Sequence, residues 1–306
     1  MSDQAEKLRL LAGVELNQSR TGFTTRPARR KNMRVIAVTS GKGGVGKTNM
    51  VANLALALIH YGKKVMVIDA DLSLANIDVL LGITPRFNLA HVLMGHKSLD
   101  EVIVTGPGGL RIIPASSGIQ EMAHLTEVQK TNLIHGFLDL KEETDVILID
   151  TAAGISWNVI SFILAADETI IVTTPEPTAV TDAYAIIKTI YTRNPLAQAG
   201  ILVNMAANRR EAEQTAEKIA AVTRQFLRID IARLGFITTD PAVRKAIRIQ
   251  RPFILSAPNT PASRCVKELA FNLCHNTKAN QNLSDVEGFL TRMVNLFRQT
   301  GDQAGS

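Results

Sequence analysis

The chain has 306 residues, 46% of them hydrophobic, which suits one large domain with a sizeable core and requires no second globular domain. Its formal net charge of +6 favours an anionic partner such as a nucleotide, a lipid headgroup or nucleic acid. The spacing of Cys265 and Cys274 excludes a disulfide framework and a Cys-x-x-Cys metal site, and no apolar run suits a signal peptide or membrane span, so we expect a cytoplasmic protein.

Residues 1–32 are expected to form an arm outside the globular core. Asp3 can cap a short helix, and Glu6 completes a capping box three residues later. Ala5 and Leu8 give this helix an apolar side, but it is too short to persist alone. We therefore expect it to fold in the groove of a partner, and the Thr-, Arg- and Pro-rich stretch after it to be a tether.

Segments rich in β-branched residues then alternate with segments that read as helices. The predicted strands are 35–40, 64–69, 110–113, 145–150, 168–174, 200–204 and 233–237, and the predicted helices include 48–61, 128–140, 156–165, 179–191 and 209–227. The strands are apolar throughout rather than alternately, which indicates burial on both faces. The pattern predicts a doubly wound α/β fold, with a mostly parallel sheet, helices on both faces and a ligand site at the carboxyl ends of the strands.

The first strand leads into GKGGVGKT, residues 41–48, which fits the phosphate-binding loop G-x-x-x-x-G-K-[ST]. Glycines permit positive φ and close backbone approach, so that successive N–H groups can point at phosphates; those of the loop are Gly41, Gly43, Gly44 and Gly46. Lys47 is expected on the β and γ phosphates, and the Thr48 hydroxyl on Mg²⁺. Lys42 is a second lysine that the general pattern does not require.

Two predicted strands end in carboxylates. Asp69 and Asp71 lie on the same side of an extended chain, because side chains in a strand repeat every two residues. Asp150 ends the apolar strand VILID, a Walker B arrangement in which the carboxylate reaches the Mg²⁺ site. Gly154 lies in the predicted switch 151–155, where the backbone can approach the γ-phosphate. The sequence has no metal-binding His pair and no Ser-His-Asp set. Any hydrolysis of a bound nucleotide must therefore proceed by positioning and by electrostatic stabilisation of its Mg²⁺ complex.

Near the C-terminus, one helical segment has an apolar stripe. Its members lie three or four residues apart, with Arg292 at the edge, and include Phe289, Leu290, Met293, Val294 and Phe297. Such a helix can lie in the surface of an anionic membrane, with Arg292 and Arg298 available to acidic headgroups. It can also be a terminal helix that packs on the domain's own core, and the pattern leaves both arrangements open.

The loop GKGGVGKT is similar to the deviant phosphate loop of the MinD/ParA class of ATPases, whose signature lysine matches Lys42. The resemblance implies that Lys42 reaches the ATP of a second subunit, so that ATP and Mg²⁺ produce a homodimer. It implies that Asp69 supports Mg²⁺ through its water shell and that Asp71 orients the attacking water. The other implied positions are Val45 and Asn49 at the nucleotide, Asn76 at the subunit interface, and Asn204 and Asp240 at the adenine base.

The string DQAEKLR, residues 3–9, resembles the activator motif of the FlhG type (also called FleN), the flagellar-number regulators of this class. The resemblance implies an activator arm at 1–32, a MinD-like ATPase domain at 33–277, and a linker with a membrane-targeting helix at 278–306. The implied activator residues are Asp3, Gln4, Ala5, Leu8 and Arg9.

That type implies a slow ATPase switch that controls the number or placement of flagella. Its implied partners are an FlhF-type GTPase, flagellar C-ring proteins, a flagellar transcription activator and an anionic membrane. The implied location is the cytoplasm and, with ATP bound, the inner face of the cell membrane.

Two relatives in the same class are alternatives. A ParA-type partition ATPase would bind DNA through the many basic residues between 209 and 251, and a cell-division MinD would share the membrane mechanism without needing the arm. Iron–sulfur relatives of the class need cysteines between subunits, which Cys265 and Cys274 do not provide.

Overall fold

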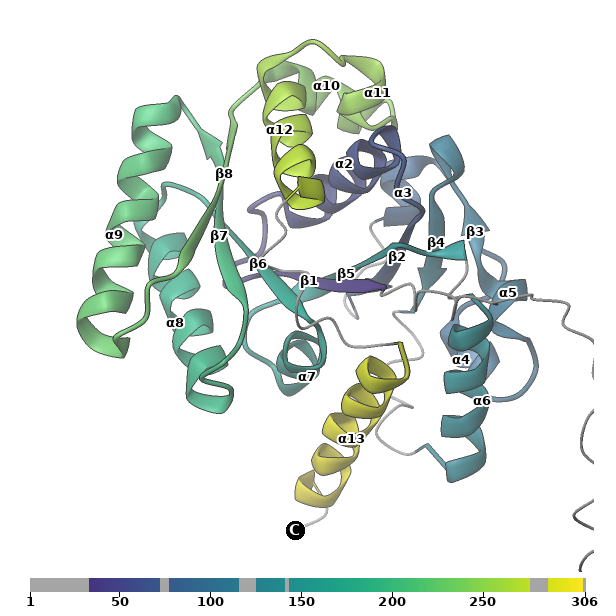
Figure 1. The fold of residues 1–306 in the computed structure, drawn as a ribbon. Helices are drawn as coiled ribbons and strands as arrows, with labels where there is room; N and C mark the ends of the chain where they lie inside the picture. The colour runs from purple at the N-terminus through teal and green to yellow at the C-terminus, as the bar shows by residue number, and fades with distance from the viewer. Residues whose placement is uncertain (1–32, 72–76, 116–124, 141–142, 276–285, 305–306) are drawn as a thin grey trace, which may run out of the picture. The chain divides into compact units, whose positions relative to one another are not determined.

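The computed structural model describes residues 33–71, 77–115, 125–140, 143–275 and 286–304. At its centre is an eight-stranded sheet in the order β3-β4-β2-β5-β1-β6-β7-β8 (Figure 1). Its strands are β1 (Arg34–Ser40), β2 (Val65–Ala70), β3 (Val104–Thr105), β4 (Arg111–Pro114), β5 (Val146–Ala153), β6 (Glu168–Thr173), β7 (Ala199–Ala206) and β8 (Ala232–Thr238). Neighbouring strands are parallel, except that β3 is antiparallel to β4.

Helices cover both faces of this sheet. One face carries α2 (Lys47–His60), α3 (Ile77–Leu81), α10 (Pro241–Arg248), α11 (Phe253–Ser256) and α12 (Pro261–His275). The other carries α4 (Leu89–Leu93), α5 (Leu99–Val102), α6 (Glu127–Asp139), α7 (Trp157–Ala165), α8 (Pro177–Arg193), α9 (Arg209–Leu227) and α13 (Val286–Ala304). The predicted doubly wound α/β fold is confirmed.

Strand β1 shows why apolar strands require this double covering. Ile36 and Val38 are buried in the cluster under α2, whereas Val35 and Ala37 are buried on the opposite face. Because side chains alternate along a strand, a continuous apolar run is buried only when both faces are covered. In the sheet β1 lies between β5 and β6, at the point where the strand order reverses. That is the position at which ligands bind in open α/β sheets.

Helix α13 is docked on the domain, so of the two arrangements left open by its apolar stripe the structure has the second. The stripe residues are at most 2% exposed and join the core cluster of α6 and α7; they are Phe289, Leu290, Met293, Val294 and Phe297. The rings of Phe297 and Phe162 meet edge to face at 5.2 Å. A membrane role for these residues stays a prediction, and it requires the helix to leave this position.

Polar contacts also hold α13. The indole Nε1 of Trp157 donates to the carbonyl oxygen of Leu296 at 3.1 Å. The Arg292 guanidinium, expected to be available to lipid headgroups, instead donates to the carbonyl of Ala165 at 2.6 Å and lies 3.6 Å from Asp167. This corrects the expectation for Arg292, because the last turn of α7 leaves carbonyls that need donors. In the described part of the chain, no helix is both long and apolar enough to cross a membrane.

Candidate nucleotide site

The loop between β1 and α2 has the backbone of a phosphate cradle. Gly44 and Gly46 both have φ of 81°, a left-handed conformation that glycine adopts without strain. A Cβ atom at Gly41 would lie 2.5 Å from the backbone of Asp182 in α8, so only glycine fits there. Helix α2 begins at Lys47, within the last two residues of the loop. Its free N–H groups and helix dipole favour an anion at this point.

Lys47 and Asp150 form a buried ion pair beneath the loop. The Nζ of Lys47 donates to Oδ1 of Asp150 at 2.6 Å, and the two side chains are 7% and 0% exposed. The pair brings the loop lysine to the end of β5, where the sequence places the Walker B carboxylate. Because a buried ion loses its hydration, each partner depends on the other until a ligand replaces one of them.

Carboxylates in the carboxyl halves of β2 and β5 lie side by side. Asp69 and Asp150 are register partners in the sheet. Burial, followed by the charge of Asp150, raises the pKa of Asp69 to about 7. Burial also raises the pKa of Asp150, while Lys47 and the Thr48 hydroxyl oppose that rise. Asp71 is 8% exposed, and its charge also acts on Asp150. Such crowding of carboxylates is typical of a site that holds a cation.

The donor set fits Mg²⁺ with its usual partners. Oδ2 of Asp150 is buried without a hydrogen-bond partner among the residues that the structure describes. Within the same residues, no group of three or more His, Cys, Asp or Glu side chains could hold a metal alone. Mg²⁺ typically takes only one or two carboxylates and completes its octahedron with water and phosphate oxygens. Thr48, Asp69 and Asp150 therefore fit Mg²⁺ that arrives with a nucleotide better than a resident metal.

Lys42 points to a carboxylate of its own chain. Its Nζ donates to Oε2 of Glu176 at 2.8 Å and to Oγ1 of Thr178 at 3.1 Å, at the start of α8. Lys42 and Glu176 are 42% and 64% exposed, so the pair is open to solvent. Sequence analysis missed Glu176 and Thr178. No motif in the sequence marks them, because Glu176 reaches Lys42 only through the pairing of β6 with β1.

The segment after Asp150 continues β5 as far as Ala153, and Gly154 follows with φ of 97°. The N–H of Gly154 donates to the carbonyl of Ser40 at 2.8 Å. The N–H of Gly154 is thus engaged by β1, and the approach of this backbone to a phosphate stays a prediction. Its Cα hydrogens still face open space.

A second part of the site is an apolar cavity of about 330 Å³ beside the loop. It lies among the loop, the ends of β7 and β8, α10 and α11, and its lining includes Gly46, Asn49, Met50, Asn204, Met205, Ile237, Thr239, Asp240, Val243, Arg244, Ile247 and Phe253. An aromatic base suits a mostly apolar cavity with few polar groups. Asn49, Asn204 and Asp240 were predicted here, whereas the apolar wall was missed, because single apolar residues carry no motif.

The predicted base-contacting side chains have structural duties. Asn204 donates through Nδ2 to the carbonyl of Val45 at 2.7 Å, which ties β7 to the phosphate loop. The two Asp240 oxygens accept from the N–H groups of Ala242 at 2.9 Å and Ala262 at 3.2 Å. Asp240 thus caps α10 and holds the start of α12, and both of its carboxylate oxygens are engaged. It shapes the cavity wall.

Some predicted residues lie outside the described part of the chain. They are Asn76 of the expected interface and the activator residues Asp3, Gln4, Ala5, Leu8 and Arg9. The remaining predicted residues of the phosphate loop and the carboxylates are brought together at one edge of the sheet, as the strand order requires.

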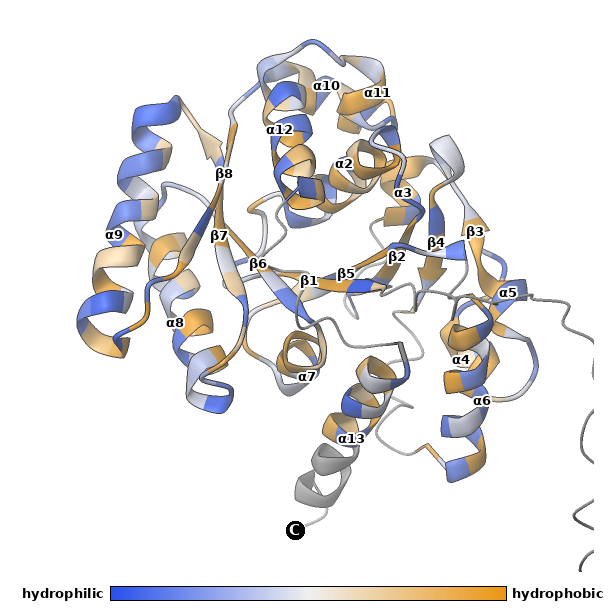
Figure 2. Ribbon diagram, viewed as in Figure 1, coloured by the Kyte–Doolittle hydropathy of each residue, from blue (hydrophilic) through white to orange (hydrophobic). Residues whose placement is uncertain are grey.

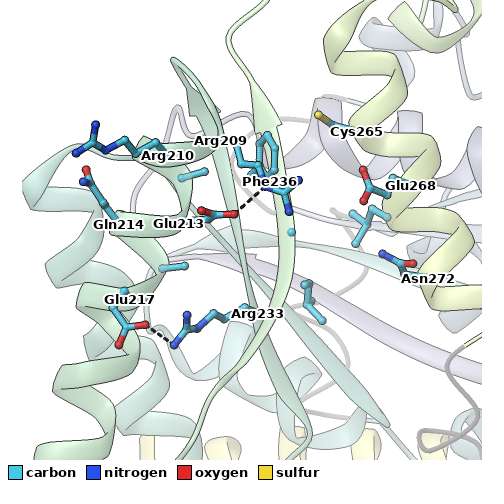
Figure 3. A pocket seen from close by; sticks show the side chains of 15 residues that line it. Arg209, Arg210, Glu213, Gln214, Glu217, Arg233, Phe236, Cys265, Glu268 and Asn272 are labelled. Carbon is cyan, nitrogen blue, oxygen red and sulfur yellow. Dashed lines mark hydrogen bonds and ion pairs between the residues drawn. The ribbon is translucent and has the colours of Figure 1, made fainter.

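A further hollow of about 590 Å³ runs along the free edge of β8, between α9 and α12 (Figure 3). Arg209 pairs with Glu213 at 2.7 Å, and Arg233 pairs with Glu217 at 2.5 Å, so its charges largely satisfy each other. It has no phosphate loop and no crowded carboxylates. The smaller cavity beside the loop therefore remains the candidate site.

Comparison with known proteins agrees with this geometry. Residues 33–198 match the family described as an AAA domain. The chain is 47% identical over 238 residues to the antiactivator FleN of Pseudomonas aeruginosa, which covers 78% of this chain and 85% of the relative. It is 36% identical over 240 residues to the flagellum site-determining protein YlxH of Helicobacter pylori, covering 78% and 81%.

Solved structures give the same result for the fold. The septum site-determining protein MinD of Pyrococcus horikoshii, complexed with Mg-ADP, superposes with a TM-score of 0.64 at 26% identity. The match covers 80% of this chain and 97% of that protein.

Proposed function

Since the chain belongs to the MinD/ParA class of ATPases and resembles its FlhG (FleN) type, we propose that it is an ATP-dependent switch that regulates the number or placement of flagella. The names of two relatives, an antiactivator FleN and a flagellum site-determining protein, support the flagellar role. The observation that carries the switch is the position of Lys42. Its amine is held by Glu176 in a position open to solvent, where a second subunit could receive it.

In this proposal ATP places its phosphates on loop 41–48 and its base in the cavity beside Asn204. Lys47 then exchanges Asp150 for phosphate oxygens. Mg²⁺, when bound, neutralises phosphate charge; Thr48 and Asp150 would hold it, and Asp69 would hold its water shell. Asp71 orients the attacking water. Hydrolysis is slow without a partner or membrane, as in other switch ATPases that depend on positioning.

Dimerisation follows from the charge of the nucleotide. A triphosphate in an open site carries more negative charge than Lys47 and one Mg²⁺ offset. Lys42 of a second copy supplies the missing cation, once it has left Glu176. The dimeric state then reports that ATP is bound.

Membrane binding competes with docking for one apolar stripe. Burial of an apolar side chain such as Phe289 or Phe297 is worth about 1.5–3 kcal/mol in either place. In the proposal, the ATP dimer presents two undocked copies of α13 to an anionic membrane, and the pair binds more tightly than one copy. The protein thus resides in the cytoplasm and, with ATP, on the inner face of the cell membrane.

The proposed partners come from the resemblance. They are an FlhF-type GTPase stimulated by residues 1–32, flagellar C-ring proteins and a flagellar transcription activator. DNA, the partner of the ParA-type alternative, is less favoured because the two relatives named above are flagellar proteins. Part of the basic segment is also engaged, since Arg209, Arg224 and Arg233 are paired with carboxylates.

The test is co-sedimentation with anionic liposomes in ADP or in a non-hydrolysable ATP analogue, with duplex DNA as a competitor. Trp157 is the only tryptophan and donates to α13, so its fluorescence reports undocking. We expect sedimentation and a fluorescence change with the analogue only, and neither in Lys42→Ala. Lys63→Ala, a partly exposed lysine beyond the far end of α2, is the matched control. A Lys42→Ala protein that dimerises and sediments like the wild type would remove the switch.

A further inference from the structure

The basic residues between 209 and 251 divide into two groups with different surroundings. On α9, Arg209 pairs with Glu213 at 2.7 Å, and Arg224 lies 3.2 Å from Asp230. On α10 and the turn after it, the cations are Arg244, Lys245, Arg248 and Arg251, and all four are exposed. Among the described residues, no ion pair or hydrogen bond engages their side chains. No carboxylate of the described residues therefore offsets their mutual repulsion through an ion pair.

Exposed aliphatic side chains are interleaved with these cations. Ile247 is 47% exposed and Ile249 is 55% exposed, and Leu255 of the adjoining α11 is 41% exposed. Figure 2 shows both hydrophilic and hydrophobic stretches along α10, beside the mostly hydrophobic α11. Arg244, Ile247 and Arg248 share one face, because residues three and four apart are neighbours on a helix. We call Arg244 to Arg251, with Leu255, the α10 surface.

The α10 surface is rigid rather than a loose tail. The turn after the helix is held by backbone bonds from Gln250 to Ile247 at 3.1 Å and from Arg251 to Ala246 at 3.1 Å. Gln250 has φ of 49°, a conformation that a non-glycine residue adopts at some cost. Ala246 and Phe253 anchor the two helices in the core. A partner would therefore meet a preformed surface and lose little free energy in ordering it.

We propose that the α10 surface docks an acidic, amphipathic segment of a protein partner. Carboxylates of that segment would pair with the cations, and its apolar side chains would cover Ile247 and Ile249. Nucleic acid fits less well, because phosphates and sugars would leave the isoleucines uncovered. Several exposed apolar side chains close together within a polar rim mark a site of protein–protein interaction.

The same surface forms a wall of the base cavity. Arg244 and Ile247 line that cavity as well as the exterior of α10. A segment docked on one side of α10 would therefore change the affinity for nucleotide on the other, and nucleotide would change docking by the same factor. This coupling rests on the proposed function, whereas the docking itself does not, so the two can fail separately.

The probe is a labelled helical peptide with glutamates on one face and leucines on the other, measured by fluorescence anisotropy. We expect Arg248→Gln/Arg251→Gln to weaken its binding by about tenfold or more, and Ile249→Asn to weaken it by a similar factor. Arg209→Gln/Arg224→Gln removes the same charge from paired residues and is the matched control. It is expected to change binding by less than about twofold.

Three outcomes overturn the proposal. They are no binding of the peptide to the wild type, equal binding by the control and the test variant, and duplex DNA that binds through the arginines regardless of Ile249. Circular dichroism of each variant establishes that it is folded. Saturating peptide should also change the affinity for a fluorescent ATP analogue by about fivefold or more. Peptide binding without that change would retain the docking and remove the coupling.

Discussion

The candidate nucleotide site and the docked helix α13 differ in how fully their buried polar groups are hydrogen-bonded. At the carboxyl ends of β1 and β5, Asp150 and Thr39 each keep a buried oxygen without a hydrogen-bond partner in the described structure. Around α13, by contrast, Trp157 and Arg292 both donate to carbonyls, and the apolar stripe is buried. Unmet polar groups in a buried site predict a ligand, since each costs free energy until it is satisfied. The contacts of α13 are already made within the domain, so this interface needs no ligand. A membrane or partner can only compete with the domain for the same apolar stripe.

The largest effect is expected at the nucleotide site. Lys47→Ala should lower the rate of ATP hydrolysis by at least about 100-fold, because the lysine is the main fixed cation for the phosphates. The protein should still fold, because Asp150, whose pKa is already raised by burial, can take up a proton. Lys97→Ala, which removes a cation from an exposed ion pair, is the control. Phosphate release measures both rates, and a Lys47→Ala rate within about tenfold of wild type would contradict the assignment.

The docked helix α13 instead predicts a large effect on stability. Phe297→Ala should lower the free energy of unfolding by about 3–5 kcal/mol, because it leaves a cavity against Phe162. Phe226→Ala on α9 removes the same ring from a position that is 65% exposed, and should cost less than about 0.5 kcal/mol. Urea unfolding without nucleotide compares them. Equal stabilities of the two variants would mean that α13 is not docked in solution.

Asp69 offers a prediction that depends on pH. Its pKa is about 7 in the folded protein against 3.8 for the ordinary group, so folding favours the protonated form. Its contribution to stability is present below about pH 4 and is lost as the pH rises through about 7, with a ceiling of roughly 4 kcal/mol. Asp69→Asn should therefore be more stable than wild type at pH 8 by about 2 kcal/mol.

The measurement is urea unfolding from pH 5 to pH 8 without Mg²⁺ or nucleotide. The stability difference between wild type and Asp69→Asn should grow as the pH rises across this range. Asp139→Asn changes an exposed carboxylate and should show a flat difference. A flat difference for Asp69→Asn would mean that the carboxylate is not crowded as described.

The nucleotide site could be predicted well from the sequence, whereas the position of α13 was left open, and both outcomes have physical reasons. The phosphate loop is encoded locally, because glycines at fixed spacing after a strand permit the φ of 81° and the close backbone approach that a phosphate cradle needs. The stripe around Phe289 is amphipathic whichever apolar surface covers it, so its pattern cannot distinguish a membrane from α7. Glu176 was missed because its contact with Lys42 depends on β6 lying next to β1, which the order of strands along the chain does not reveal.

The smallest predicted effect concerns the pair of Lys42 and Glu176, which is proposed to break when the ATP dimer forms. Glu176 and Lys42 are 64% and 42% exposed, so their interaction is worth at most about 1 kcal/mol. If Glu176 holds Lys42 until a second subunit's nucleotide competes for it, Glu176→Gln should lower the ATP concentration at half-maximal dimerisation by up to about fivefold. Analytical ultracentrifugation measures this midpoint, and Glu101→Gln, in the exposed pair with Lys97, is the control. The shift should shrink at high salt, which screens exposed charges; a salt-independent shift would assign Glu176 a packing role instead.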